Sequence, residues 1–346
     1  MQFSNTFKFF AYCFSILFTN NFIVAQIIAL PEPITNQATA VLKKSKEEYI
    51  YTFFGLSNSK QSHGVHRKVF RTNMKTGESK MIGLVPDSLG RLASSASTIR
   101  NKAYVVGGYG VYQNGKEISS KQVFIFDPGS ESFSKGADLP VAIDDQVQAV
   151  WRDSLLYVIS GWNDSNNVQA VQIYNPATNH WKLATPLPNE LTAAVFGGCG
   201  TITGDTIYIL GGATFAKFYP PSRQFYKGII NPADPSKINW INAGDYPGEF
   251  RYRAVAFAKE GKVYFWGGSN ETYNYNGISY QAKRPVEPNK TVLIYDIKSG
   301  LFTTKIAGTP IMDLRNEVYT SDKRWYVAGG IGPGQQLQNA IIEIQE

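Results

Sequence analysis

The chain has 346 residues, of which 43% are hydrophobic, 14% aromatic and 18% charged, with a formal net charge of +7. This apolar and weakly charged composition excludes an intrinsically disordered chain. The lysines and arginines are scattered rather than gathered in a stripe, and no nucleic-acid-binding motif occurs. We therefore expect no nucleic acid partner.

The first 25 residues are typical of an export signal. Lys8 precedes the apolar run FFAYCFSILF (residues 9–18), and Ala25 is the candidate last residue of the signal. The run is too short to cross a bilayer comfortably. We expect residues 1–25 to be removed, which would leave an exported chain, periplasmic or secreted, without a membrane span. An uncleaved anchor is the alternative.

An apolar run that ends in glycine recurs six times along the rest of the chain. The runs are YIYTFFG, AYVVGG, LLYVISG, TIYILGG, KVYFWGG and RWYVAGG, ending at Gly55, Gly108, Gly161, Gly212, Gly268 and Gly330. Glycine is unfavourable in a strand because it costs entropy and offers no side chain for packing. Its recurrence at the same place therefore indicates a structural repeat.

Residues 146–188 show what one repeat contains. QVQAVW, LLYVISG, VQAVQIYNP and HWKLATPLP are four short strands, separated by turn residues. No amphipathic helix of useful length occurs in the chain. Six four-stranded units with a period of about 50 residues predict an all-β fold, a six-bladed β-propeller.

Aromatic residues seven positions apart flank the turn between the third and fourth strands, as in Phe126 and Phe133, Tyr174 and Trp181, and Tyr295 and Phe302. With the glycine pair, this spacing resembles the kelch repeat. The resemblance implies one kelch-type propeller over residues 26–346. Two repeats depart from it: the first has Thr72 and Ser79 in place of the aromatic pair, and the fourth is stretched between Tyr226 and Trp240.

The sixth repeat lacks its outer strand. After Gly330 only one strand remains, QLQNAIIEIQE, whereas IIALPEP at residues 27–33 resembles the outer-strand ends LATPLP and KGADLP. We expect this N-terminal segment to pair with the C-terminal strand and close the ring, because closure leaves no long edge exposed.

Propeller geometry brings the link into each inner strand and the loop after each glycine to the same end of the channel, here called the top. These segments combine charged, amide and aromatic residues, which suits a carbohydrate. They also suit a protein partner, and loops that merely cover the core are the third interpretation. The candidate ligand-binding residues are Arg91, Asp144, Asp145, Trp162, Arg251, Arg253, Tyr273, Tyr275 and Arg315. We expect an acidic sugar to pair with Arg251.

The layout is also similar to that of the exported bacterial sialic acid mutarotases (N-acetylneuraminate epimerases), which are six-bladed kelch propellers closed by an N-terminal strand. The resemblance implies a sugar mutarotase or epimerase that uses a carboxylate and an arginine. Arg223 matches the arginine of those enzymes, whereas Gly212 and Ala213 stand where they carry a glutamate. Whether the chain is an enzyme stays open, with Glu190, Glu249 and Arg223 as candidate catalytic residues.

Metal chemistry is not expected. The three histidines, His63, His66 and His180, lie on different repeats or in one loop, and they cannot easily converge with carboxylates on one ion. We expect neither a metal nor another cofactor.

Overall fold

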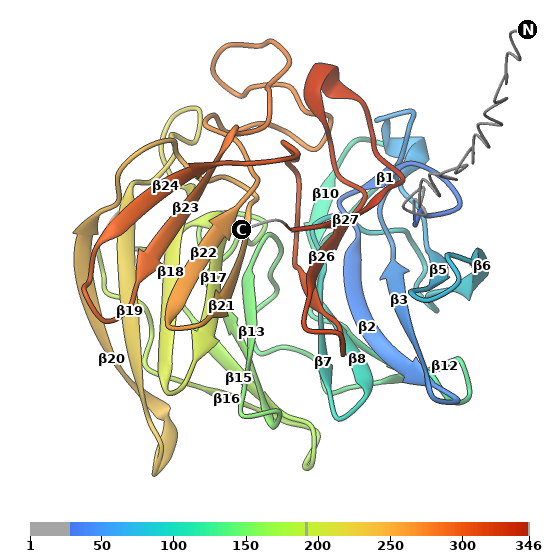
Figure 1. Ribbon diagram of the computed structural model, residues 1–346, viewed down its shortest axis with the longest axis horizontal. Helices are drawn as coiled ribbons and strands as arrows, with labels where there is room; N and C mark the ends of the chain where they lie inside the picture. The colour runs from blue at the N-terminus through green and yellow to red at the C-terminus, as the bar shows by residue number, and fades with distance from the viewer. Residues whose placement is uncertain (1–27, 191–192, 345–346) are drawn as a thin grey trace, which may run out of the picture.

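The computed structural model describes residues 28–190 and 193–344, so the predicted signal over residues 1–25 lies outside the described residues. The described chain is all-β apart from two short 3₁₀ helices, η1 (Ser62–Gly64) and η2 (Pro333–Gln335). Five four-stranded antiparallel sheets and one three-stranded sheet are arranged as the blades of a propeller (Figure 1). The six-bladed all-β fold predicted from the repeats is confirmed. Within the described ranges, no helix has the length and apolar character needed to cross a membrane.

Each blade runs in chain order from its inner to its outer strand. The strands are β2 (Ala38–Lys44), β3 (Glu47–Phe53), β5 (Lys68–Asn73) and β6 (Ser79–Leu84) in blade 1; β7 (Ser95–Ile99), β8 (Lys102–Val106), β11 (Val123–Asp127) and β12 (Ser132–Lys135) in blade 2; β13 (Val147–Trp151), β14 (Leu155–Ile159), β15 (Val171–Asn175) and β16 (His180–Leu183) in blade 3; β17 (Phe196–Thr203), β18 (Thr206–Ala213), β19 (Gln224–Asn231) and β20 (Asp234–Asp245) in blade 4; β21 (Val255–Lys259), β22 (Lys262–Trp266), β23 (Thr291–Asp296) and β24 (Phe302–Ile306) in blade 5; and β25 (Val318–Tyr319), β26 (Trp325–Ala328) and β27 (Ile341–Glu343) in blade 6.

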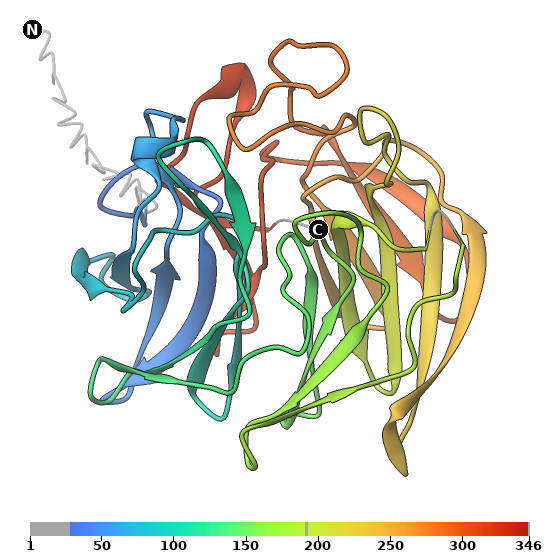
Figure 2. The ribbon, with the colours of Figure 1, turned by 180° about the vertical axis from the view of Figure 1, so that it is seen from behind.

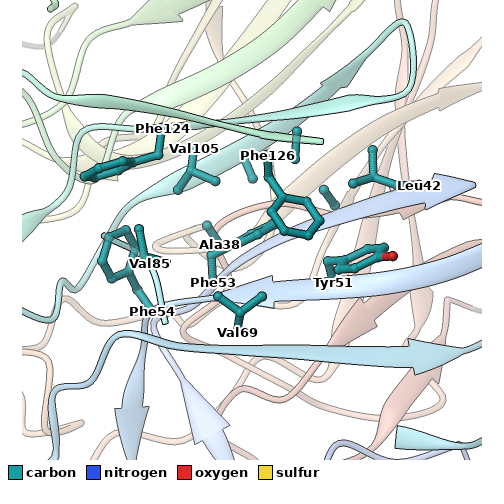
Figure 3. Packing of buried hydrophobic residues seen from close by; sticks show 13 residues of the cluster. Ala38, Leu42, Tyr51, Phe53, Phe54, Val69, Val85, Val105, Phe124 and Phe126 are labelled. Atoms are coloured by element: carbon teal, nitrogen blue, oxygen red, sulfur yellow. The ribbon is translucent and has the colours of Figure 1, made fainter. Parts of the chain in front are cut away.

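Apolar side chains fill the space between neighbouring blades. Between blades 1 and 2, for example, Phe53 and Phe126 lie edge to face with their ring centroids 5.4 Å apart, within a cluster drawn from both sheets (Figure 3). Burying one such ring stabilises the fold by about 1.5–3 kcal/mol. Because each sheet packs both of its faces on neighbours, the second strands read as continuous apolar runs rather than as an alternation.

The seven-residue aromatic spacing has a direct structural cause. Tyr174 on β15 and Trp181 on β16 are paired across the hairpin, with ring centroids 5.0 Å apart, and the two other pairs have the same register. In blade 1 the same positions hold Thr72 and Ser79, whose hydroxyl groups are 2.7 Å apart. A hydrogen bond thus replaces the aromatic contact at this hairpin.

The glycines join each blade to the next. Gly211 has φ +72°, and a Cβ there would lie 2.1 Å from the carbonyl oxygen of Arg251 in the following blade. The N–H of Gly212 donates to that same carbonyl at 2.7 Å. Equivalent hydrogen bonds run from Gly55 to Arg91, Gly108 to Ile143, Gly161 to Val195, Gly268 to Ile311 and Gly330 to Ile34. Glycine is needed because two backbones meet where a side chain would clash.

The N-terminal segment closes the ring, as predicted. The N–H of Leu30 donates to Asn339 O at 2.6 Å and the N–H of Ile341 donates to Ile28 O at 2.9 Å, while Ala29 and Ala340 form an antiparallel bridge. The segment therefore takes the place of the outer strand that blade 6 lacks.

Candidate functional site

The top of the channel is built on one backbone pattern that occurs in all six blades. The residue after each glycine pairs with a residue in the link into the same blade's inner strand. The pairs are Thr35 with Leu56, Leu92 with Tyr109, Asp144 with Trp162, Phe196 with Ala213, Tyr252 with Ser269 and Met312 with Ile331. The link and the glycine loop of each blade therefore share the top end, as the sequence predicts.

The next residue of each link lies on the channel. We call these six the ring positions: Asn36, Ala93, Asp145, Gly197, Arg253 and Asp313. All have φ between +47° and +65°, a region that non-glycine residues rarely adopt. Backbone hydrogen bonds hold this conformation, because Asp145 N donates to Ala93 O, Gly197 N to Asp145 O and Arg253 N to Gly197 O at 2.7–3.2 Å. The ring positions thus carry their side chains on a fixed frame.

Arg91 and Arg251 do not line the channel mouth. They stand two residues before a ring position, where the other blades have Ile34, Ile143, Val195 and Ile311, and their side chains enter the space between blades. The Arg91 guanidinium lies over Phe54 and Phe124 and pairs with Asp87. The Arg251 side chain, 1% exposed, contacts Glu249 at 3.6 Å and Thr291 at 2.9 Å. Both arginines therefore hold blades together.

Two arginines and two aspartates form a buried network across the channel. Arg253 binds Asp145 at 2.7 Å and Asp313 at 3.2 Å, and Arg315 contacts the same two carboxylates at 3.4 and 3.1 Å. The two guanidinium groups hold the pKa of Asp145 below its usual range against the opposing effect of burial. The charges of the four residues cancel within the network.

Further hydrogen bonds fix Asp313 in this network. Asn36 and Thr35, from blade 1, donate to its Oδ2, and the Tyr273 hydroxyl donates to its Oδ1 at 3.4 Å. Tyr273 is buried and its ring packs against Arg253. The candidate residue Tyr273 thus supports the network from behind and does not line the cavity above it.

Above the network lies a cavity of about 280 Å³, displaced toward blades 2–4. It is lined by Tyr109, Glu117, Ser119, Asp144, Asp145, Trp162, Asp164, Phe196, Tyr219, Arg253, Asn274 and Tyr280. We call it the mouth pocket. Of the nine ligand-binding candidates, Asp144, Asp145, Trp162 and Arg253 line it.

Aromatic rings form one wall of the mouth pocket. Trp162 lies 5.5 Å from Phe196 and 5.7 Å from Tyr219, and Tyr219 lies 5.0 Å from Tyr280, measured between ring centroids. Tyr219 belongs to the loop after β18 and Tyr280 to the long loop before β23, which stands highest above the ring in Figures 1 and 2. The two loops are joined by a hydrogen bond from Thr272 Oγ1 to Tyr219 O at 2.7 Å.

Carboxyl groups also line the mouth pocket. Ser119, on β10 (Glu117–Ser119), donates its hydroxyl to Asp144 at 2.6 Å and its N–H to Asp164 at 2.7 Å. Burial, and then the neighbouring Asp145 charge, raise the pKa of Asp144 well above its usual value. Desolvation also raises the pKa of Glu117. The pocket therefore places the carboxyl group of Asp144, which favours protonation, beside the carboxylate of Asp145, which stays ionised.

The remaining candidates lie elsewhere. Tyr275 packs against a cluster that includes Leu92 and Tyr109, and Arg315 lies in the network beneath the pocket. Glu190 accepts hydrogen bonds from Tyr226 and Asn242 on blade 4. Glu249 pairs with Arg251, and Arg223 lies over the ring of Phe250 while donating to backbone carbonyls. None of the three catalytic candidates lines the mouth pocket.

Eight of the twelve pocket residues are not among the nine candidates: Tyr109, Glu117, Ser119, Asp164, Phe196, Tyr219, Asn274 and Tyr280. Phe196 has the same place in its blade as Asp144, so an alignment of the six links would have identified it. Glu117 and Ser119 had no such signal, because the hairpin of β9 (Tyr109–Val111) and β10 that carries them to the pocket rim occurs in blade 2 alone among the described blades.

A second cavity, of about 380 Å³, lies along the inner strands below the network, with lining residues that include Gln148, Asn316 and Glu317. Burial raises the pKa of Glu317 to about 7. In the described part of the chain, no group of three or more His, Cys, Asp or Glu side chains is arranged to hold a metal ion.

The fold and its repeats define a six-bladed β-propeller with a polar-aromatic pocket at one mouth of its channel. Kelch-motif models match residues 90–140 and 152–188, which span blade 2 and most of blade 3. The chain is therefore a propeller that carries kelch motifs.

Known proteins resemble the chain at a distance. Beta-scruin of Limulus polyphemus is 25% identical over 266 residues, which cover 68% of this chain and 27% of that protein. Kelch-like protein 25 of Xenopus tropicalis is 28% identical over 190 residues, 53% of this chain and 29% of that protein. The chain thus spans less than a third of the length of these curated relatives. The structure of YjhT superposes with a TM-score of 0.71 at 13% identity, covering 92% of this chain and 97% of that one, which is a likeness of fold.

Proposed function

We propose that the protein is a carbohydrate-binding propeller whose site is the mouth pocket. The observation that carries the proposal is the pairing of an aromatic wall, made by Trp162, Phe196 and Tyr219, with a polar side made by Ser119 and Asp144. A sugar has apolar ring faces and hydroxyl edges, and this arrangement offers a partner to each.

The size of the pocket supports one sugar unit. A cavity of about 280 Å³ lies at the small end of the range for ligand pockets, which fits one sugar unit better than a long oligosaccharide. The groups that would meet the ligand come from blades 2 to 5, so they are held by several sheets rather than by one flexible loop. Residues 1–25 support the further proposal that the chain meets its ligand outside the cytoplasm.

Binding can be tested by saturation-transfer NMR with a panel of monosaccharides. Trp162→Ala should abolish or weaken the signals of every sugar that binds, because it removes one face of the wall. Tyr319→Ala removes an exposed aromatic residue from the lower cavity at the other end of the channel and serves as the control. Sugar binding that survives in Trp162→Ala would contradict the proposal.

Sugar mutarotation is the second candidate function. It is favoured by one observation: Asp144, with a raised pKa, and Asp145, with a lowered one, are neighbours on the same pocket. Ring opening needs one group that gives a proton and one that accepts it, and a pair of carboxyl groups with separated pKa values can supply both.

Anomer exchange measured by NMR tests this second candidate. A catalytic pocket should speed exchange of a bound sugar, and Asp144→Asn should remove the acceleration while leaving binding measurable. If the unmodified protein binds a sugar but does not speed its anomer exchange, the mutarotase proposal is wrong and the carbohydrate-binding proposal stands. A protein partner at the same mouth, the other open alternative, would be favoured if no monosaccharide binds.

A further inference from the structure

We propose that the ligand of the mouth pocket carries a protonated amine and is, specifically, an amino sugar with a free ammonium group. The proposal rests on the carbohydrate site proposed above and names the chemical class of the sugar.

The first argument is the balance of charge. Among the described residues that line the pocket, Arg253 is the one cationic side chain, and its charge and that of Arg315 are already matched by Asp145 and Asp313. Three more carboxyl groups line the pocket, those of Glu117, Asp144 and Asp164. No cationic side chain of the described residues forms an ion pair with any of the three. Because burial favours the protonated forms of Asp144 and Glu117, a bound cation would supply the charge that stabilises their ionised forms.

The second argument is an unused acceptor. Asp145 is 4% exposed, and its Oδ1 accepts no hydrogen bond within the described residues, its ion-pair contact being Arg315 Nε at 3.4 Å. A buried carboxylate oxygen without a hydrogen bond is costly. The oxygen itself is shielded, but Asp145 lines the pocket, so a cation bound there would add favourable charge beside this carboxylate.

The third argument concerns the kind of cation. The same pocket is also lined by the rings of Trp162, Phe196, Tyr219 and Tyr280. The faces of aromatic rings attract organic ammonium groups. Hard metal ions require a shell of oxygen ligands instead, and the acidic side chains of the described chain are not grouped to supply one.

The same observations disfavour an acidic sugar. A carboxylate on the ligand would meet Glu117, Asp144 and Asp164, and Arg253 is already engaged by two aspartates. Arg251, which the sequence suggested as the partner of an acidic sugar, lies between blades 4 and 5 and does not line the pocket. Charge complementarity therefore selects the amine.

The test compares matched ligands by calorimetry at pH 6.5 and low salt. The probes are glucosamine, galactosamine and mannosamine, the N-acetyl form of each, N-acetylneuraminate, and ethanolamine as an amine without a sugar ring. We expect at least one free amine to bind about tenfold or more tightly than its N-acetyl partner, the difference expected for a charge-assisted hydrogen bond. The preference should shrink as salt is added.

A charge variant connects the preference to the pocket. Glu117 is exposed on its hairpin, so Glu117→Gln should leave the fold intact and reduce the preference for the amine about threefold or more. Glu78→Gln changes the net charge equally at an exposed position of blade 1 and should leave the preference unchanged.

The outcomes separate the two proposals. Equal binding of amine and N-acetyl partners, or tighter binding of N-acetylneuraminate, overturns the amine inference and leaves the carbohydrate site standing. Ethanolamine that binds as tightly as the hexosamines supports the amine and overturns the carbohydrate site. Absence of binding by every probe overturns both.

Discussion

Asp145 and Arg253 lie 108 residues apart in the sequence, at ring positions of blades 3 and 5, and meet at 2.7 Å across the channel. Blades 3 and 5 are not neighbours in the ring. The ion pair therefore joins parts of the propeller that share no sheet-to-sheet interface, and it forms the floor of the mouth pocket.

Asp145→Asn should destabilise the protein by about 3–5 kcal/mol, because it leaves two buried guanidinium groups with one carboxylate. Unfolding by urea measures the change. Asp322→Asn is the matched control: its pair with Arg324 is exposed, and such pairs contribute at most about 1 kcal/mol. Equal effects of the two variants would contradict a stabilising role for the buried network.

Leu30→Ala should lower the free energy of unfolding by about 2–5 kcal/mol, because the Leu30 side chain is buried, 2% exposed, in the segment that completes blade 6. Deletion of residues 27–33 should have the larger effect and expose the edge of β27, which favours oligomers. Thermal unfolding and light scattering report the two effects. A deleted chain that stays monomeric and melts unchanged would show that the segment does not close the ring.

Arg251→Ala should lower stability by about 2–4 kcal/mol, since it opens a cavity between blades and removes the partner of Glu249. Ligand affinity at the mouth pocket should stay within about twofold of the unmodified protein, because Arg251 does not line that pocket. Melting temperature and calorimetry on the same sample distinguish the two roles. A tenfold loss of affinity with unchanged melting would return Arg251 to the binding site.

Glu317 should make stability depend on pH. Its pKa is about 7 in the folded protein, raised by burial, against about 4.3 in an unfolded chain. Between these values the folded state holds the extra proton, so stability falls as the pH rises from about 4.3 to 7. The Glu317→Gln variant should therefore have a free energy of unfolding higher than that of the unmodified protein by on the order of 1–3 kcal/mol at pH 8. At pH 4 the two proteins should differ little. Urea unfolding at both pH values provides the measurement; a gain of the same size at both would contradict the expected titration.

The architecture could be predicted from the sequence because the features that build it repeat. The glycine that joins each blade to the next recurs in all six blades, the aromatic pair recurs in three, and the missing outer strand of blade 6 follows from closure of the ring. Thr72 and Ser79 depart from the aromatic spacing, yet they pair across the β5–β6 hairpin in the same register as the aromatic pairs. The hairpin, and not the aromatic contact, therefore sets the register.

The site was predicted only in part. The sequence placed Asp144, Asp145, Trp162 and Arg253 at the top mouth, and the structure brings these four together on one pocket. Arg91 and Arg251 are charged and close to the same links, but a shift of two residues along the chain turns a side chain from the channel into the space between blades. Composition does not reveal that shift; the apolar residues at the equivalent positions of the other links do.

The six ring positions have a consequence for how such a protein can change. All six share unusual backbone angles, and at Asp145, Gly197 and Arg253 hydrogen bonds between main-chain atoms hold them. Ala93 and Gly197 occupy the same geometry as Asp145 and Arg253. The same backbone geometry therefore carries a charged side chain in some blades and a small residue packed against its neighbours in others. Ala93 is fully buried in an apolar cluster with Leu92 and Tyr109, and a Cβ at Gly197 would lie 2.5 Å from the Tyr252 ring, so a charged side chain at either position would require its neighbours to change with it.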